Sequence, residues 1–193
     1  MNSVFIVAIC WIFFGAIHSM MIHHDLKLKI QKFFEVDDQT YRLIYALVSV
    51  ISLFICVVTT LLLDGIWLKK PDTITFIGGA LLMSGSLYLM RISFRNYSLT
   101  VFIGLQPETS TKLQISGLNR FVRHPLYLST ILFLIGLIVF WPSDIMVTTS
   151  LILIIYTVIG SRFEERKLIN QFGKEYTDYM KEVPALIPKF WEK

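Results

Sequence analysis

The chain has 193 residues, of which 54% are hydrophobic and 17% charged, and its net charge is +4. Soluble domains average about 45–50% apolar and about 25% charged residues, so the composition excludes an ordinary soluble domain and indicates an integral membrane protein. The basic residues lie between apolar runs, where such residues orient helices and contact lipid headgroups, so nucleic-acid binding is not expected.

Five apolar runs predict an all-α, multi-pass membrane protein that forms a single domain over residues 1–193. A helix that crosses the bilayer needs about 20 mostly apolar residues, within a usual range of about 17–25. Pro142, Ser143 and Asp144 separate the last two runs, and they predict a tight helical hairpin because Pro142 would break one long helix. The predicted spans are 4–22, 43–63, 74–92, 126–141 and 145–161.

The first run contains His18, and an ionisable residue inside a span is by default a candidate functional residue. We therefore treat His18 as a candidate substrate-binding residue, although it could also simply meet headgroups or Ser19 near the end of the helix. Cys10 and Cys56 each lie inside an apolar run. We therefore expect neither a disulfide framework nor a thiolate metal site.

Basic residues predict the orientation of the spans. With five crossings, nearly all lysines and arginines fall on one side of the membrane, and Lys69 and Lys70 fall on the other. The positive-inside rule then places the N-terminus outside and the C-terminus in the cytoplasm. The first cytoplasmic segment, 23–42, is expected to be a short charged link, and the segment 93–125 is long enough to suggest a functional loop.

Small residues in the third run predict helix packing. This run contains Gly78, Gly79 and Gly85, with Ser84 and Ser86. Glycines seven residues apart return to one helical face, where small residues let helices approach closely in lipid.

The C-terminal tail predicts an amphipathic helix that lies along the cytoplasmic surface. After Arg162, apolar and aromatic residues recur every three or four positions, with charged residues on the opposite face. The apolar stripe consists of Ile169, Phe172, Tyr176, Tyr179 and Val183.

Polar residues at the base of the predicted hairpin could bind a zwitterionic ligand. The fourth run begins at Arg123-His124-Pro125, and the fifth returns to the same side at Glu164-Glu165, so the hairpin places His124 and Glu164 at neighbouring levels. Free N–H groups at a helix N-terminus favour a carboxylate, and a glutamate can accept from an ammonium or from ribose hydroxyls. Each residue also has a structural interpretation, such as Pro125 starting a helix.

Four sequence strings together resemble the isoprenylcysteine carboxyl methyltransferase superfamily: GLNRFVRHPLY (117–127), RFEERKL (162–168), FGKEYTDY (172–179) and VPALIP (183–188). The resemblance is closer to its methanethiol S-methyltransferase-like bacterial membrane branch than to the prenylcysteine enzymes. It implies an S-adenosylmethionine-dependent methyltransferase whose cofactor-binding part, about 93–190, faces the cytoplasm. The cofactor-binding residues implied by the resemblance are Leu113, Gln114, His124, Pro125, Leu126, Tyr127 and Glu164.

Two departures from the prenylcysteine enzymes bear on the methyl acceptor. Gly160 stands where they have a substrate-contacting arginine, and Asn119 stands where they have a tyrosine. Carboxyl methylation of a prenylated cysteine is therefore disfavoured. A thiol, a carboxylate and a lipid-like acceptor all remain open.

Methyl transfer needs alignment of the acceptor, the methyl group and the leaving sulfur, and few reacting side chains. Arg162 is a catalytic candidate, with Arg166 and Arg123 as alternatives, because a cation can hold an anionic acceptor or lower the pKa of a thiol. Glu165 is a second candidate because a carboxylate can act as base for an amine acceptor. Arg123 joins His18 as a candidate substrate-binding residue, and no metal is expected.

A non-catalytic membrane protein on the same fold, such as an assembly factor or a lipid- or partner-binding protein, is the alternative. The spans hold almost no charged residues, which disfavours a small ion-coupled transporter subunit. The sequence does not fix the oligomeric state.

Overall fold

The computed structural model describes residues 3–95 and 113–188. These residues form seven α-helices and one short 3-10 helix, and they group into two compact units that we describe separately. Among the described residues, unit 1 comprises 3–69 and 143–152, and unit 2 comprises 70–95, 113–142 and 153–188.

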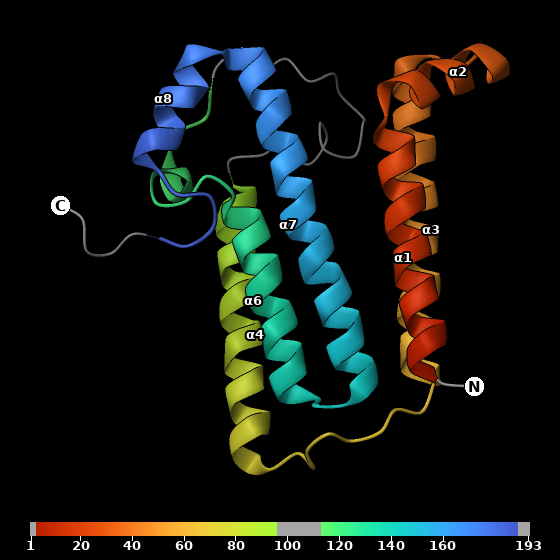
Figure 1. Ribbon diagram of the computed structural model, residues 1–193, viewed down its shortest axis with the longest axis vertical. Helices are drawn as coiled ribbons and strands as arrows, with labels where there is room; N and C mark the ends of the chain where they lie inside the picture. Colours follow the sequence, from red (N-terminus) through yellow and green to blue (C-terminus); the bar gives the residue numbers. More distant parts are fainter. Residues whose placement is uncertain (1–2, 96–112, 189–193) are drawn as a thin grey trace. The chain divides into compact units, whose positions relative to one another are not determined.

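Helices long and apolar enough to cross a membrane account for most of the described chain. The all-α membrane fold and all five apolar helices are confirmed, whereas the sidedness and the count of five crossings stay predictions. The segment 96–112, the centre of the predicted functional loop, lies outside the described residues. The four long helices are α1 (Ser3–Ile22), α3 (Asp38–Leu62), α4 (Thr73–Phe94) and α7 (Asp144–Phe172), and α6 (Pro125–Phe140) is apolar but shorter (Figure 1).

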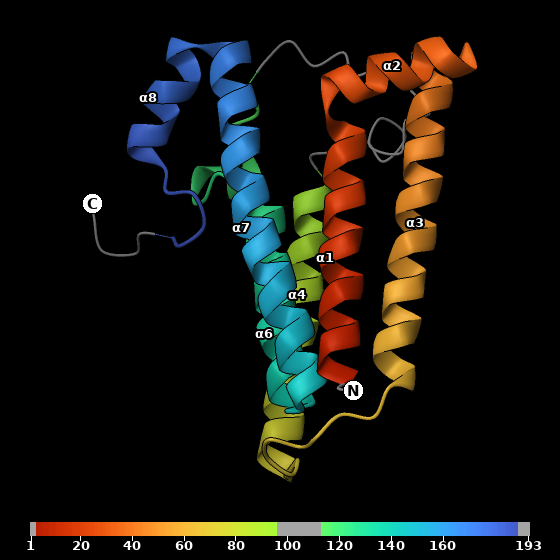
Figure 2. The same cartoon turned by 45° about the vertical axis from the view of Figure 1, so that its right-hand side comes forward.

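In unit 1, α1 and α3 run side by side and are joined by polar contacts between buried side chains (Figure 2). The Trp11 indole donates to the Thr60 hydroxyl at 3.0 Å, and that hydroxyl donates to the Cys56 carbonyl at 2.8 Å. Such contacts hold helices together in lipid, where the hydrophobic effect gives no driving force for their association.

A short helix, α2 (His24–Phe34), connects α1 to α3. The sequence predicts only a charged link over 23–42, because its many charges conceal the apolar positions that recur along one helical face. Glu35 ends α2 in the left-handed region at φ 52°, and Asp37 caps α3 by accepting from the Thr40 amide at 2.8 Å.

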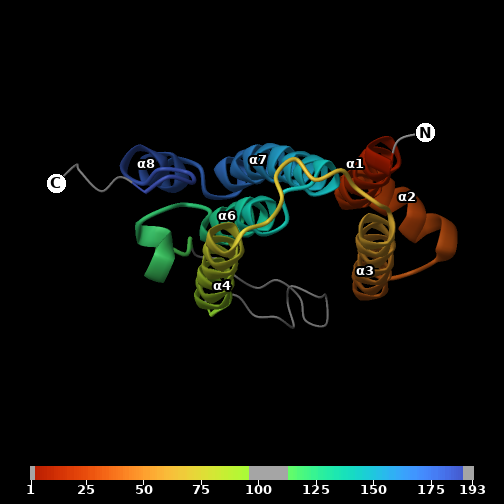
Figure 3. The same cartoon turned by 90° about the horizontal axis from the view of Figure 1, so that it is seen from below.

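In unit 2, α4 packs tightly against α6, and the two helices lie next to each other in Figure 3. The expectation that small residues of this run pack against a neighbouring helix holds at Gly79 but not at Gly78 and Gly85, where a Cβ would meet nothing within 4 Å. The packed face passes through Gly79, where a Cβ would lie 2.5 Å from the Phe140 amide nitrogen. The face continues through Ser86 and Ser93, which are both buried.

Gly79→Ala is therefore expected to destabilise the protein, and Gly78→Ala is its matched control. At Gly79 the added methyl meets backbone that cannot move aside, and overpacking of this kind typically costs about 1–3 kcal/mol. At Gly78 the methyl enters open space, and alanine has the higher helix propensity. Thermal unfolding in detergent micelles measures both. Equal stability of the two variants would contradict this packing face.

The tail forms two helices where the sequence predicts one. α7 continues to Phe172, and α8 (Lys174–Glu182) follows after Gly173, whose φ of 55° ends the first helix. Positive φ is readily adopted by glycine because it has no Cβ. The predicted apolar stripe is nevertheless one packed cluster, formed by Tyr176, Tyr179 and Val183 against Leu113, Leu168, Ile169, Phe172 and Met180.

Candidate functional site

The polar centre of unit 2 lies where the 3-10 helix η1 (Gly117–Arg120) leads into α6. Pro125 occupies the first turn of α6, a favoured position because its fixed φ suits a helix start and no N–H is lost there. His124 precedes it, is buried, and stacks on Tyr127 with ring centroids 5.4 Å apart. The sequence RHPLY thus places a histidine ring at the N-terminus of an apolar helix.

Arg123 and Glu165 form a buried ion pair at this centre. Their side chains are 7% and 6% exposed, and two guanidinium nitrogens, Nε (3.0 Å) and Nη2, donate to Glu165 Oε1. Arg123 Nη1 also donates to the carbonyls of Val183 at 2.5 Å and Met180 at 3.2 Å. One guanidinium therefore joins the start of α6, the α7 carboxylate and the C-terminal end of α8, where a cation also complements the helix dipole.

Backbone hydrogen bonds attach the segment after α8 to the same place. The Arg123 amide donates to the Pro184 carbonyl at 2.9 Å, and the His124 amide donates to the Ala185 carbonyl at 3.0 Å. The Tyr179 hydroxyl donates to the Asn119 carbonyl. This supporting role of the VPALIP segment (183–188) is not predicted from the sequence, where its position directly after the apolar stripe is the one signal for it.

His124 lies between two neighbouring carboxylates. Its Nε2 is 3.3 Å from Glu165 Oε1, and its Nδ1 is 3.8 Å from Glu164 Oε2. The Glu164 side chain is 38% exposed, in contrast to the buried Glu165. The structure thus brings His124 and Glu164 together, as the predicted hairpin requires, and leaves Glu164 accessible to a ligand.

Burial lowers the pKa of His124 below its usual value of 6.5, although the Glu164 and Glu165 carboxylates act in the opposite direction. The same burial raises the pKa of the Tyr176 hydroxyl, beside this cluster, to about 12. Both side chains are therefore neutral at pH 7.

The lowered pKa of His124 predicts a pH-dependent stability. An unfolded histidine titrates near pH 6.5, so the contribution of the neutral buried ring is complete above that pH and is lost as pH falls through the lower folded pKa. We expect the melting temperature of the protein to fall more steeply below about pH 6.5 than that of His124→Gln, whose side chain does not titrate. Melting curves from pH 8 to pH 5 test this, and parallel curves would contradict it.

The other predicted site residues differ in their exposure and in their contacts. Arg162 is 69% exposed, with Nη1 3.6 Å from Glu165 Oε2. Leu113 packs against the tyrosine cluster, and Gln114 is exposed and donates to the Ser116 hydroxyl at 3.0 Å. Leu126 is half-buried next to the buried Pro125. The chemical roles of all these residues stay predictions.

His18 belongs to unit 1, where both of its ring nitrogens contact α3. Nε2 is 2.7 Å from the Tyr45 hydroxyl, and Nδ1 is 3.0 Å from the Ser49 hydroxyl. The ring also stacks on Phe14 with centroids 5.6 Å apart. These contacts give His18 a structural role in joining α1 to α3, and its predicted role in substrate binding stays untested.

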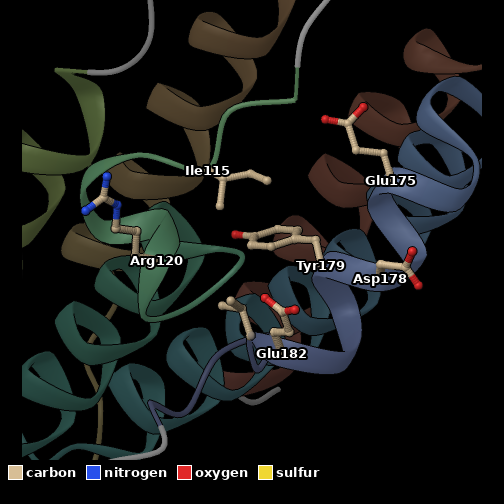
Figure 4. Close-up of a pocket in the computed structure, with 7 residues that line it drawn as sticks. Ile115, Arg120, Glu175, Asp178, Tyr179 and Glu182 are labelled. Atoms are coloured by element: carbon tan, nitrogen blue, oxygen red, sulfur yellow. The ribbon is translucent and has the colours of Figure 1, made fainter.

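A shallow cavity of about 330 Å³ lies between α8 and the segment that contains η1 (Figure 4). Its lining contains none of the predicted cofactor-binding residues. Within residues 3–95 and 113–188, no group of three or more histidine, cysteine, aspartate or glutamate residues could hold a metal ion. The cavity is lined by Ile115, Arg120, Glu175, Asp178, Tyr179, Glu182 and Val183.

Comparisons with known proteins give a family and several relatives. The profile of the NnrU protein family matches residues 5–189. The chain is 30% identical over 135 residues to methanethiol S-methyltransferase 1 of Bradyrhizobium diazoefficiens, covering 64% of the chain and 45% of that relative. It is 33% identical over 87 residues to methanethiol S-methyltransferase of Mycobacterium tuberculosis, covering 43% of the chain and 33% of the relative. The chain thus spans less than half the length of these relatives, and no solved structure matches it.

Proposed function

The chain belongs to the NnrU protein family and is distantly homologous to methanethiol S-methyltransferases, and from this premise we propose that it is a membrane methyltransferase that transfers a methyl group from S-adenosylmethionine to a small thiol. The observation that supports this most is the pairing of His124 with the accessible Glu164 at the start of α6. The names of the relatives and the departures at Gly160 and Asn119 favour a thiol over a prenylated substrate.

The residues at this centre fit the polar end of the proposed cofactor. The Glu164 carboxylate can accept from an ammonium or from ribose hydroxyls. The first turn of α6 presents backbone N–H groups, such as that of Leu126, which have no acceptor within the helix and favour a carboxylate. The His124 ring, which stacks on Tyr127, lies beside this carboxylate. Leu113 and Gln114 remain proposed cofactor contacts.

S-adenosylmethionine, when bound, supplies an electrophilic methyl group on a positively charged sulfur. The chain must then align the acceptor and favour its thiolate form. Arg162 is suited to this because its guanidinium is exposed and lies beside the centre. A nearby cation lowers the pKa of a thiol and so increases its nucleophilic fraction. We therefore keep Arg162 as the proposed catalytic residue.

Glu165 and Arg123 are better suited to positioning the site than to reacting with substrate. A general base must reach the proton it abstracts. The Glu165 carboxylate is buried and already accepts from Arg123, and that guanidinium is itself occupied by Glu165 and two backbone carbonyls. Their proposed function is to hold His124 and the α7 carboxylates in place.

The proposal includes the orientation of the chain across the membrane. With the N-terminus outside and the C-terminus inside, the His124 centre faces the cytoplasm, where a soluble cofactor could enter. Membrane lipids surround the apolar helices, and the methyl acceptor is the other proposed partner.

Calorimetric titration of the detergent-solubilised protein with S-adenosylhomocysteine, the reaction product, tests the proposal. We expect micromolar binding, followed by transfer of isotope-labelled methyl from S-adenosylmethionine to methanethiol. Adenosine is the control ligand because it lacks the amino-acid end that Glu164 and α6 would hold, and it should bind more weakly. If a folded sample binds no S-adenosylhomocysteine, the chain is a non-catalytic protein on a methyltransferase-like fold.

A further inference from the structure

The two cysteines of the chain meet between α1 and α3 in unit 1. Cys10 Sγ lies 2.8 Å from Cys56 Sγ, and the Cys56 thiol is also 3.3 Å from the Cys10 carbonyl. Both thiols are free, Cys56 is buried, and Cys10 is half-buried. The sequence indicates no such pairing, because 46 residues separate the two positions and each lies in a different apolar run.

Polar contacts from α1 reach α3 on either side of Cys56 and fix the register that brings the thiols together. Towards one end of the helices, Trp11 donates to Thr60 at 3.0 Å. Towards the other end, His18 contacts Ser49 at 3.0 Å and Tyr45 at 2.7 Å. A slip or rotation of α1 against α3 would break these bonds in an apolar environment, where unsatisfied polar groups are costly. The thiol contact is therefore a constrained feature of the helix pair.

We propose that Cys10 and Cys56 form an intramolecular disulfide that covalently links α1 to α3, with a lipid-soluble quinone as the oxidant. Two S–H bonds break and one S–S bond forms, and the two protons and two electrons released reduce the quinone to its hydroquinone. A quinone fits because both cysteines lie well inside membrane-spanning helices, which charged, water-soluble disulfides cannot enter. Cys10 is the thiol that such an oxidant reaches, since it is the more exposed of the two.

The test uses the full-length protein, reduced and reconstituted in lipid nanodiscs, with decylubiquinone as the probe. We expect each chain to lose the mass of two hydrogen atoms, to reduce one equivalent of quinone, and to yield a peptide that joins the Cys10 and Cys56 segments under non-reducing conditions. Cys10→Ser and Cys56→Ser should each abolish all three signals.

A relocated thiol is the matched control. Ile9 is 53% exposed and is rotated by about 100° from Cys10 on the helix. The double variant Cys10→Ser, Ile9→Cys therefore keeps a lipid-accessible thiol that points away from Cys56, and it should remain reduced. Retention of both thiols in the parent, a disulfide between two chains, or equally fast oxidation of the relocated variant would overturn the proposal. None of these results depends on cofactor binding at the His124 centre.

Discussion

Replacement of Arg123 by alanine is expected to lower the free energy of unfolding by about 3–5 kcal/mol, the usual cost of removing one partner from a buried ion pair. The substitution leaves the Glu165 carboxylate buried without its cation, and it removes the donor that Val183 and Met180 share. Because Arg123 joins α6, α7 and α8, we also expect the segment after α8 to become susceptible to proteolysis.

Arg162→Ala is the matched control, because Arg162 is also near Glu165 but is exposed. An exposed pair contributes about 0–1 kcal/mol, so this variant should remain close to the parent. Denaturant unfolding in detergent, followed by circular dichroism, compares the two. The double variant Arg123→Met, Glu165→Leu should recover part of the loss, since no unpaired charge is then buried. Equal effects of Arg123→Ala and Arg162→Ala would show that the buried pair does not organise this unit.

Replacement of Glu164 by alanine is expected to weaken the binding of S-adenosylhomocysteine roughly tenfold or more, since a hydrogen bond to a charged group contributes about 1.5–3 kcal/mol. The fold should be retained because the Glu164 side chain is partly exposed and its contact with a neutral His124 is long. Calorimetry measures the affinity, and a melting curve checks the fold.

Glu175→Ala is the control variant, because it also removes one carboxylate but at a position outside the proposed cofactor site. Glu175 is an exposed residue of α8 that lines the cavity beside α8 and is not among the proposed cofactor contacts, so its loss should not affect the affinity. Parent-like binding by Glu164→Ala would remove Glu164 from the cofactor site, even if S-adenosylhomocysteine binds. Loss of binding in both variants would indicate a general electrostatic effect.

The five apolar helices and several of their boundaries could be predicted from the sequence, whereas α2 and the division of the tail into two helices could not. Apolar runs of the right length predict the positions of all five apolar helices, because a helix in lipid must be apolar along its whole length. Pro125 and the turn at Pro142 mark helix boundaries for local steric reasons that no tertiary contact can change. The proximity of His124 and Glu164 also follows from the sequence, since a hairpin aligns the base of one helix with the end of the next.

The face that each helix turns towards its neighbour follows from the packing of the helices and could not be predicted from the sequence. Gly79 packs against α6 while the adjacent Gly78 does not, and Glu165 is buried while the adjacent Glu164 is accessible. Adjacent residues are separated by about 100° around the axis of a helix. When a helix is apolar on all sides, its hydrophobic periodicity does not show which of two adjacent residues faces the neighbouring helix. The contact of Cys10 with Cys56 likewise depends on the register of two helices that are distant in sequence. Sequence patterns predict which residues share one face of a helix. A site also depends on how the helices are rotated relative to one another, and that is set by their packing.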